Sequence, residues 1–399
     1  MSDLPRLLYF SDVLAESTYS GALLMHRLLE AYPADRLVIV ETSHQLSKPE
    51  HRLPGVTYRS LAVGTDRLAF TRFHTWFHLW MTMRTSAWAS AVPAALGTFE
   101  PEAVLTVVHG HAWAAAAAFA RRRALPLHVI VHDDWPRMAA MPRGFARRVD
   151  DQLGPVYRSA ASRLCVSPWM AEEYQQRYGA AAGVLYPSRG RSTESSAAPP
   201  ERLGRQQGGL TVAFAGTIRA GEHYRLLRIV AAALRPSAGR VLVFGPMTVE
   251  QAAAEGLNES NVHFKGMVDQ RTLAARLREE ADALLVPMSF DPADAANMRV
   301  SFPSKLVDYT AVGLPLLICG PEYASAVQWA RRYPGVAEVI GSPDPAAVEH
   351  ALDQLADPAY RTQLAVRAIE VGTQLFSHQA AWATFTAALR ASKPDQRVA

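Results

Sequence analysis

Residues 301–315 have the sequence SFPSKLVDYTAVGLP, and the apolar run LLIC follows them at 316–319. Pro303 suits the first position of a helix, and Gly313 suits the position just past its last residue, Val312. The apolar run has the composition of a buried strand. The sequence therefore predicts a short helix that leads into a strand of an α/β domain.

The start of this predicted helix carries Ser304 and Lys305. The first backbone N–H groups of a helix have no partner within it, and the helix dipole favours negative charge at that end. A hydroxyl and an ammonium add side-chain donors. The carboxylate of Asp308 lies one turn further on, on the same face as Ser304. Donors for a phosphate beside a carboxylate for hydroxyls indicate a nucleotide-linked ligand.

Strand-like runs alternate with helical segments along the rest of the chain. They lie at 7–10, 37–40, 104–108, 127–131, 163–166, 184–186, 210–215, 240–244, 262–264, 283–286 and 316–319. Strands separated by helices are typical of parallel sheets, so we expect two Rossmann-like, doubly wound α/β domains that face a cleft. No Gly-x-Gly-x-x-Gly follows the first strand, which argues against a dinucleotide site there.

The domain boundaries follow from a segment that breaks this alternation. Ser, Arg, Gly, Pro and Gln without apolar periodicity fill residues 188–209, a composition typical of a linker. We expect a first domain over 1–190, a linker over 191–209, a second domain over 210–373 and a final helical segment over 374–399. A chain of 399 residues also exceeds what one hydrophobic core usually serves.

Composition restricts the classes of partner and the location. The formal net charge is +4 and the pI is about 9.1, which fits anionic ligands or an anionic membrane surface better than nucleic acid. Cys165 and Cys319 lie in apolar runs, as buried thiols do. Residues 1–6 lead directly into a strand, and no run of about 18 apolar residues is present. We therefore expect a cytoplasmic protein, with peripheral membrane association left open.

The second half resembles the donor-binding half of retaining glycosyltransferases of family 4, which have the GT-B fold. The resemblance rests on residues 301–315, which carry a Phe-Pro-Ser-Lys-Leu variant of the family's helix, together with residues 266–268 and 281–287. Ala215-Gly216-Thr217 is similar to the family's Gly-rich turn. The C-terminal helix of 374–399 is similar to the GT-B helix that crosses back onto the first domain. The resemblance implies sugar transfer from a nucleotide diphosphate sugar.

The resemblance also implies roles for individual residues. Backbone amides near Phe302 and Pro303, with Ser304 and Lys305, are expected to hold the diphosphate at the helix start. Asp308 matches the second acid of a Glu-(seven residues)-Glu pattern that binds the ribose hydroxyls. Fixed donors at the diphosphate stabilise the charge that grows there as the sugar leaves.

Two positions depart from the family pattern. The first acid of the pair falls on Val300, and a Lys expected after the Gly-rich turn falls on Glu222. Substitutes for the missing acid are left open among Asp291, Asp294 and Asn297. Our candidate for the missing cation is Arg219, with Arg225 as the alternative, because a guanidinium binds phosphate in a bidentate fork. The alternative interpretation of Arg219 is a solvated surface side chain.

In the first domain, His109-Gly110-His111 ends a predicted strand and opens a helix. This resembles a His-x-His or Asp-x-His segment of the family, so His111 is the candidate catalytic residue, expected to hydrogen-bond the sugar or the acceptor. His109 and His132 are candidates for acceptor binding in the cleft, and the start of the first helix, Ser20-Gly21, is a further one.

A metal site at these histidines needs a third ligand, which His132-Asp133-Asp134 could supply, but no close His or Cys pair supports zinc. We therefore expect no metal and no cofactor. A histidine satisfied within the core remains the alternative for both His111 and His132.

Residues 67–88 combine aromatic and basic side chains at steps of three and four. The members are Arg67, Phe70, Arg72, Phe73, Trp76, Phe77, Trp80, Met81, Arg84 and Trp88. Such a helix suits a membrane interface or a lipid-linked acceptor, and the alternative is a helix packed on the first sheet. Arg137, Arg143, Arg147 and Arg148 form a second basic segment.

The sequence thus predicts a retaining, metal-independent glycosyltransferase whose acceptor is a glycan, a lipid-linked sugar or a small molecule. No pair of carboxylates has glycosidase spacing. The resemblance to the family implies attack on the same face of the sugar, assisted by the leaving phosphate. The alternatives are a nucleotide-sugar binding protein without transfer, a sugar-nucleotide epimerase of the same fold, and a non-enzymatic membrane scaffold.

Overall fold

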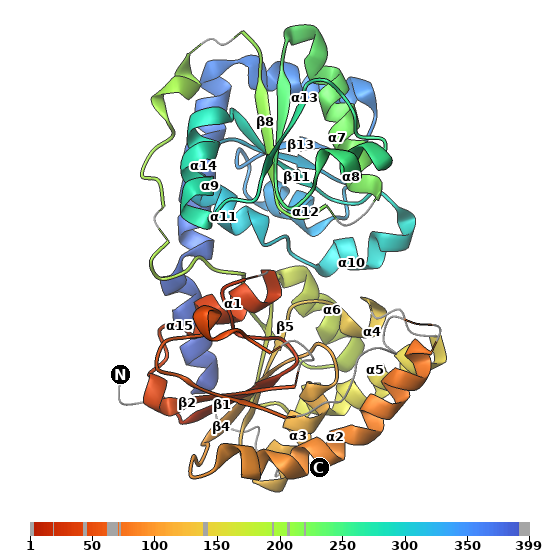
Figure 1. Cartoon of the computed structure of the whole chain (residues 1–399), viewed down its shortest axis with the longest axis vertical. Coiled ribbons are helices and arrows are strands. Elements are labelled where there is room, and N and C mark those ends of the chain that lie inside the picture. The colour runs from red at the N-terminus through yellow and green to blue at the C-terminus, as the bar shows by residue number, and fades with distance from the viewer. Residues whose placement is uncertain are drawn as a thin grey trace. The chain divides into compact units, whose positions relative to one another are not determined.

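The computed structural model describes residues 4–18, 20–42, 46–61, 71, 73–138, 143–193, 195–205, 208–218 and 221–390. The chain divides into two compact units. Unit 1 comprises the described residues up to Arg191 and those from His378 onward, and unit 2 comprises Ser192–Ser377. Each unit is a parallel sheet covered by helices (Figure 1).

Unit 1 contains a sheet of seven parallel strands in the order β3-β2-β1-β4-β5-β6-β7. The strands are β1 (Leu7–Ser11), β2 (Leu37–Glu41), β3 (Thr57–Ser60), β4 (Ala103–Val107), β5 (Leu127–Val131), β6 (Ser162–Cys165) and β7 (Gly183–Val184). The central strands are buried along their whole length, as expected for a parallel sheet covered on both faces. The order reverses between β1 and β4, the kind of position where such sheets bind ligands.

The helices of unit 1 form a layer on each face of this sheet. They are α1 (Ser20–Leu29), α2 (His74–Leu96), α3 (Ala112–Arg122), α4 (Trp135–Met138), α5 (Arg143–Ser159), α6 (Pro168–Tyr178) and α15 (His378–Leu389), with the 3₁₀ turns Ala34–Arg36 and Pro49–His51. α1 and α15 pack against each other, and α3 packs against α2 and α5. The 67–88 stretch therefore contributes a helix that begins at His74; residues 67–70 and 72 lie outside the described residues.

The C-terminal helix α15 belongs to the hydrophobic core of unit 1. Its Phe385 and Leu389 are buried in one cluster with Leu7 and Ile39 of the sheet, and the ring of Trp382 meets Tyr32 edge-on with centroids 6.2 Å apart. The preceding helix α14 runs to Phe376, and Ser377 has extended backbone angles. The predicted boundary at residue 374 therefore lies inside α14, and the chain passes back to unit 1 at residue 378.

Unit 2 contains a sheet of six parallel strands in the order β10-β9-β8-β11-β12-β13. The strands are β8 (Thr211–Ala215), β9 (Arg240–Phe244), β10 (Val262–Gly266), β11 (Ala283–Pro287), β12 (Leu316–Cys319) and β13 (Glu338–Ile340). The order reverses between β8 and β11, so the carboxyl ends of these two strands flank the position where a ligand is expected.

Helices cover both faces of this second sheet (Figure 1). They are α7 (Gly221–Leu234), α8 (Val249–Ala254), α9 (Gln270–Glu280), α10 (Ala295–Val300), α11 (Lys305–Val312), α12 (Ser325–Arg332), α13 (Pro345–Ala356) and α14 (Pro358–Phe376), with the 3₁₀ turns Glu201–Gly204, Arg235–Ser237 and Pro292–Asp294. α13 packs against α7, and α11 packs against α14 and α9.

The described residues of the predicted linker over 191–209 pack against unit 2, which begins at Ser192. Arg202 donates to the buried carboxylate of Asp282 at 2.6 Å. The buried guanidinium of Arg361 on α14 donates to the carbonyl oxygens of Leu203 and Arg205 at 3.1 and 3.0 Å. These bonds fix a polar segment whose composition alone is typical of a flexible connection.

Candidate functional site

The predicted helix at 301–315 is α11, and it is fastened to the end of β8. The buried hydroxyl of Tyr309 accepts a hydrogen bond from the Ala215 N–H at 2.7 Å and lies 3.3 Å from the Ala215 carbonyl oxygen, to which it donates. Because Ala215 precedes Gly216 and Thr217, this contact holds the Gly-rich turn against the first turns of α11.

Gly216 and Lys305 lie directly side by side. A Cβ on Gly216 would come within 2.7 Å of Cε and 2.8 Å of Nζ of Lys305, and the residue has a φ of +134°. A larger residue would therefore be strained and would displace the lysine. The ammonium of Lys305 lies 5.1 Å from the ring centroid of Phe214, a cation–π contact. The structure thus places a cation at the carboxyl end of β8.

Helix α11 begins at Lys305 with Ser304 as its N-cap, two residues later than Pro303, the predicted start. The N–H groups of Leu306 and Val307 bond to the carbonyl oxygens of Pro303 and Ser304, both at 3.1 Å, so the first turn is tightened. The Ser304 side chain makes no capping bond. Its hydroxyl is consequently available at the positive end of the helix dipole.

The other end of α11 is closed by protein groups. Gly313 is the C-cap residue, with a left-handed φ of +77°, in agreement with its predicted role. The carbonyl oxygen of Val312 accepts hydrogen bonds from the Ser196 hydroxyl at 3.1 Å and from the Arg278 guanidinium at 2.5 Å. A cation at the negative end of the helix complements its dipole.

The residues around the start of α11 divide into core and solvent-facing groups. Asp308 is half-buried in the first turn, one turn beyond Ser304. Phe302 is buried and its ring packs on Trp329 and Phe376, so only its backbone can serve a ligand. Val300, where the family pattern has an acid, is 4% exposed and presents no group to a ligand.

The three substitutes considered for that acid differ in their bonding. Asp291 accepts from the Ala293 N–H at 2.8 Å, and the Asn297 side chain accepts from the Ser301 hydroxyl. Asp294 is the N-cap residue of α10 and makes no side-chain capping bond. Its negative charge raises the pKa of His223. Lys305 also influences the pKa of His223, so Asp294 and Lys305 both lie in the neighbourhood of this histidine.

His223 at the start of α7 is a residue that sequence reasoning missed. Its Nδ1 is buried and has no hydrogen-bond partner among the described residues. Burial lowers the pKa of His223, and the nearby charge of Lys305 lowers it further, whereas Asp294 and a backbone hydrogen bond with Pro287 act in the opposite direction. The signal was present in the sequence, because His223 directly follows Glu222, where a cation was expected.

Of the two cations proposed to replace that lysine, Arg225 is described by the structure. Arg225 pairs with Glu222 at 3.1 Å on the outside of α7, so its charge is already partly neutralised. Arg219 lies outside the described residues.

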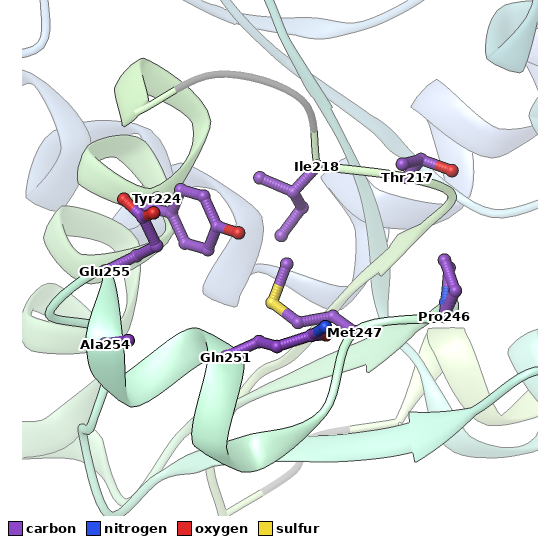
Figure 2. A pocket seen from close by; sticks show the side chains of 8 residues that line it. All are labelled: Thr217, Ile218, Tyr224, Pro246, Met247, Gln251, Ala254 and Glu255. Atoms are coloured by element: carbon purple, nitrogen blue, oxygen red, sulfur yellow. The ribbon is translucent and has the colours of Figure 1, made fainter.

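A cavity of about 460 Å³ opens beside the Gly-rich turn. It is lined by Thr217, Ile218, Tyr224, Pro246, Met247, Gln251, Ala254 and Glu255. Figure 2 shows the side chains of Tyr224, Ile218 and Met247 converging on its centre. Ser304, Lys305 and Asp308 do not line this cavity, so it is a space adjacent to the predicted diphosphate position.

In unit 1, a carboxylate that sequence reasoning missed occupies the start of α3. Asp12 follows β1 and accepts hydrogen bonds from the backbone N–H groups of His111 and Ala112, the latter at 2.8 Å. Gly110 has a φ of +66°, and a Cβ there would collide with this carboxylate. The positive end of α3 is therefore occupied by a protein group.

The predicted histidines of this unit gather around Trp135. His109 has its ring centroid 4.4 Å from that of Trp135 and its Nδ1 3.8 Å from the Asp133 carboxylate. His111 is buried, is the N-cap residue of α3 and meets Trp135 edge-on at 6.3 Å. The structure thus brings His109 and His111 to one place at the carboxyl end of β4.

His132 is buried at the end of β5, and burial lowers its pKa to about 3, with His109 adding to the effect. Asp134 beside it forms a bidentate ion pair with Arg177 at 2.7 and 2.8 Å. Within the described ranges, no group of three His, Cys, Asp or Glu side chains is arranged to hold a metal ion. Both carboxylate oxygens of Asp134 bind the Arg177 guanidinium.

The remaining candidates, Ser20 and Gly21, begin α1. A Cβ on Gly21 would meet no atom within 4 Å, so the surrounding space does not require a glycine. The side chain of Ser20 is outside the description of the structure.

Buried histidine makes the stability of the protein depend on pH. His128 in β5 is buried, its Nδ1 lies 2.8 Å from the Ser162 hydroxyl, and burial lowers its pKa to about 4. The unfolded chain binds a proton near the ordinary pKa, so the stability contributed by neutral His128 is present above about pH 6.5 and is lost as the pH falls toward 4.

Lowering the pH from about 7 to about 5 is expected to decrease the unfolding free energy of both the wild type and the His128→Asn variant. The decrease should be about 2 kcal/mol larger in the wild type. Asparagine keeps a group that can hydrogen-bond Ser162 and cannot titrate. Urea denaturation of both proteins at both pH values measures this difference. Burial raises the pKa of Glu41 to about 7, so Glu41 makes the protein more stable as the pH falls. This effect is the same in both proteins and cancels in the comparison. Parallel losses in the two proteins would contradict the assignment.

Part of unit 1 matches the model of Glycosyltransferase Family 4. The matched residues are 23–187, less than half of the chain. The match ends ahead of residues 301–315, so the Phe-Pro-Ser-Lys-Leu motif remains a prediction. No curated protein sequence matches the chain.

Solved structures match nearly the whole chain. Anabaena HepE in complex with UDP and glucose has 14% identity and a TM-score of 0.66, with 97% of this chain and 100% of that chain covered. Sucrose-phosphate synthase from Thermosynechococcus elongatus has 16% identity and a TM-score of 0.66, with 96% and 98% covered. An α,α-trehalose-phosphate synthase (UDP-forming) from Burkholderia vietnamiensis has 14% identity and a TM-score of 0.62, with 97% and 100% covered. The predicted GT-B fold of two Rossmann-like domains is confirmed.

Proposed function

We propose that the protein is a retaining glycosyltransferase that moves a sugar from a nucleotide diphosphate sugar to a glycan, lipid-linked or small-molecule acceptor, without a metal or a cofactor. The observation that carries this proposal is the position of Lys305, which starts α11 and lies against Gly216 at the carboxyl end of β8. The GT-B fold and the family match of residues 23–187 support it.

In the proposed reaction, the diphosphate lies at the start of α11. Lys305, the Ser304 hydroxyl and the helix dipole stabilise the charge that develops as the bond between the sugar and the phosphate breaks. Asp308 accepts hydrogen bonds from the ribose hydroxyls. An acceptor hydroxyl attacks the same face of the sugar, and its proton passes to an oxygen of the leaving phosphate. His111 hydrogen-bonds the sugar or the acceptor.

The first test is binding of nucleoside diphosphates, measured by thermal shift with UDP, GDP, ADP and TDP. A ligand of the native state raises stability by about 2.7 kcal/mol at a concentration of about 100 times its Kd. UDP is the first choice because HepE was solved in complex with UDP-glucose. We expect one diphosphate to raise the melting temperature. Absence of a shift with all four would overturn the donor site.

A second candidate function is nucleotide-sugar binding without transfer. It is favoured by the burial of Val300 and by the pairing of Glu222 with Arg225, because both positions lack the family's ligand-binding group. Release of the sugar or its transfer to an acceptor, followed with a radiolabelled donor, separates the two functions. A donor that binds and stays intact with every acceptor class would support the binding protein.

A further inference from the structure

Helix α2 has two apolar faces, of which one is buried and one is exposed. Phe77, Met81 and Trp88 are buried against unit 1. On the other face, Trp76 is 68% and Met83 is 65% exposed, and Trp80 lies between them. Steps of four and three residues place these three side chains in one stripe along the helix. We call this stripe the outer face of α2.

Arginines accompany the outer face. The guanidinium of Arg84 lies 4.7 Å from the ring centroid of Trp80. Further along the helix, Arg122 of α3 donates to the hydroxyls of Ser86 and Ser90 at 2.9 and 2.8 Å. No Asp or Glu occurs in residues 67–99 or 103–132, so neither α2 nor α3 supplies an acid to neutralise these cations.

The second basic segment of the sequence contributes less to such a surface. Arg137 pairs with Glu173 at 3.0 Å and with Asp134 at 3.6 Å, so it stabilises unit 1. Arg147 and Arg148 are exposed on α5, and the side chain of Arg143 is not described.

The positive charge beside the outer face of α2 favours an anionic partner. A second copy of this chain docked face to face would bring arginine against arginine without an acid from α2 or α3. Anionic headgroups of a lipid surface would neutralise Arg84 and Arg122, while tryptophan and methionine side chains enter the boundary below them. In the described part of the chain, no helix is long and apolar enough to cross a bilayer. Because its inner face is packed, α2 lies along such a surface.

We propose that the outer face of α2 docks the protein on an anionic membrane surface, with Trp76, Trp80 and Met83 inserted and Arg84 and Arg122 at the headgroups. This inference does not depend on glycosyl transfer, because it rests on unit 1 alone and needs no nucleotide. It specifies the membrane contact that the sequence suggested for residues 67–88.

The test is flotation of the full-length protein with vesicles of phosphatidylcholine alone or mixed with phosphatidylglycerol, without nucleotide. We expect flotation with the anionic vesicles, weakened by salt. The double variant Trp76→Ser, Met83→Ser should lower partitioning roughly tenfold or more, because about 1.4 kcal/mol corresponds to tenfold. Arg84→Gln should lower it roughly fivefold at low salt.

Met267→Ser is the matched control, because Met267 is 73% exposed in unit 2 and should not affect flotation. Melting temperatures verify that the exposed substitutions leave the fold intact. Absence of flotation with anionic vesicles, or equal flotation of wild type and the double variant, would overturn the proposal. Concentration-dependent dimerisation abolished by the double variant would also overturn it, in favour of a second copy.

Discussion

Lys305→Ala is expected to weaken the binding of the diphosphate that stabilises the protein by about 10- to 100-fold. Hydrogen bonds to charged groups contribute about 1.5–3 kcal/mol, and the ammonium of Lys305 lies beside Gly216 at the predicted phosphate position. Isothermal titration calorimetry measures the change. The melting temperature without ligand should change little, because Lys305 is only half-buried.

The matched control is Lys265→Ala in the same unit. Lys265 lies on the edge strand β10 and pairs with Glu280 at 2.8 Å, so diphosphate affinity should remain at the wild-type value. An unchanged affinity in Lys305→Ala would remove α11 as the diphosphate site. Equal losses in the two lysine variants would indicate a general effect of charge in place of a specific contact.

Arg361→Met is expected to lower the unfolding free energy by about 3–5 kcal/mol. The guanidinium is buried and donates to four backbone carbonyl oxygens, those of Leu203, Arg205, Leu355 and Ala356. Methionine has a similar length but no donor, so these oxygens lose their partners in the protein interior. Urea denaturation followed by circular dichroism measures the loss.

Arg367→Met on the same helix is the control for this substitution. The side chain of Arg367 is 43% exposed and pairs with Glu370 at 3.1 Å, and such a surface pair contributes about 0–1 kcal/mol. Similar stabilities of the two variants would show that the bonds of Arg361 do not anchor residues 201–205.

Strongly apolar strands were predictable from the sequence, and the edges of the sheets were not. β3 and β13 were missed because Thr57–Ser60 is polar and partly exposed and Glu338–Ile340 is only three residues long. An edge strand lacks the apolar run that marks a strand buried on both faces. Residues 191–209 were assigned to a linker from their composition, which does not reveal the bonds that join Arg202 to Asp282 and residues 203 and 205 to Arg361 of α14.

In the candidate site, too, some residues were predictable from local sequence and others were not. Lys305 and Asp308 were identified from local helix signals, but the approach of Lys305 to Gly216 depends on how β8 and α11 pack. Asp12 and His223 were missed for that reason, because each acquires its surroundings from elements distant in sequence. Local pattern identifies the type of group available, whereas tertiary packing determines which groups meet.

The return of the chain into unit 1 has a consequence for biosynthesis. Unit 2 is one continuous stretch, whereas unit 1 needs Phe385 and Leu389 of α15 to complete its core. A ribosome therefore releases all of unit 2 before the last helix of unit 1 emerges. Unit 1 stays incomplete on the nascent chain until α15 has emerged, and a message truncated after unit 2 yields a product whose first unit lacks the apolar side chains of α15.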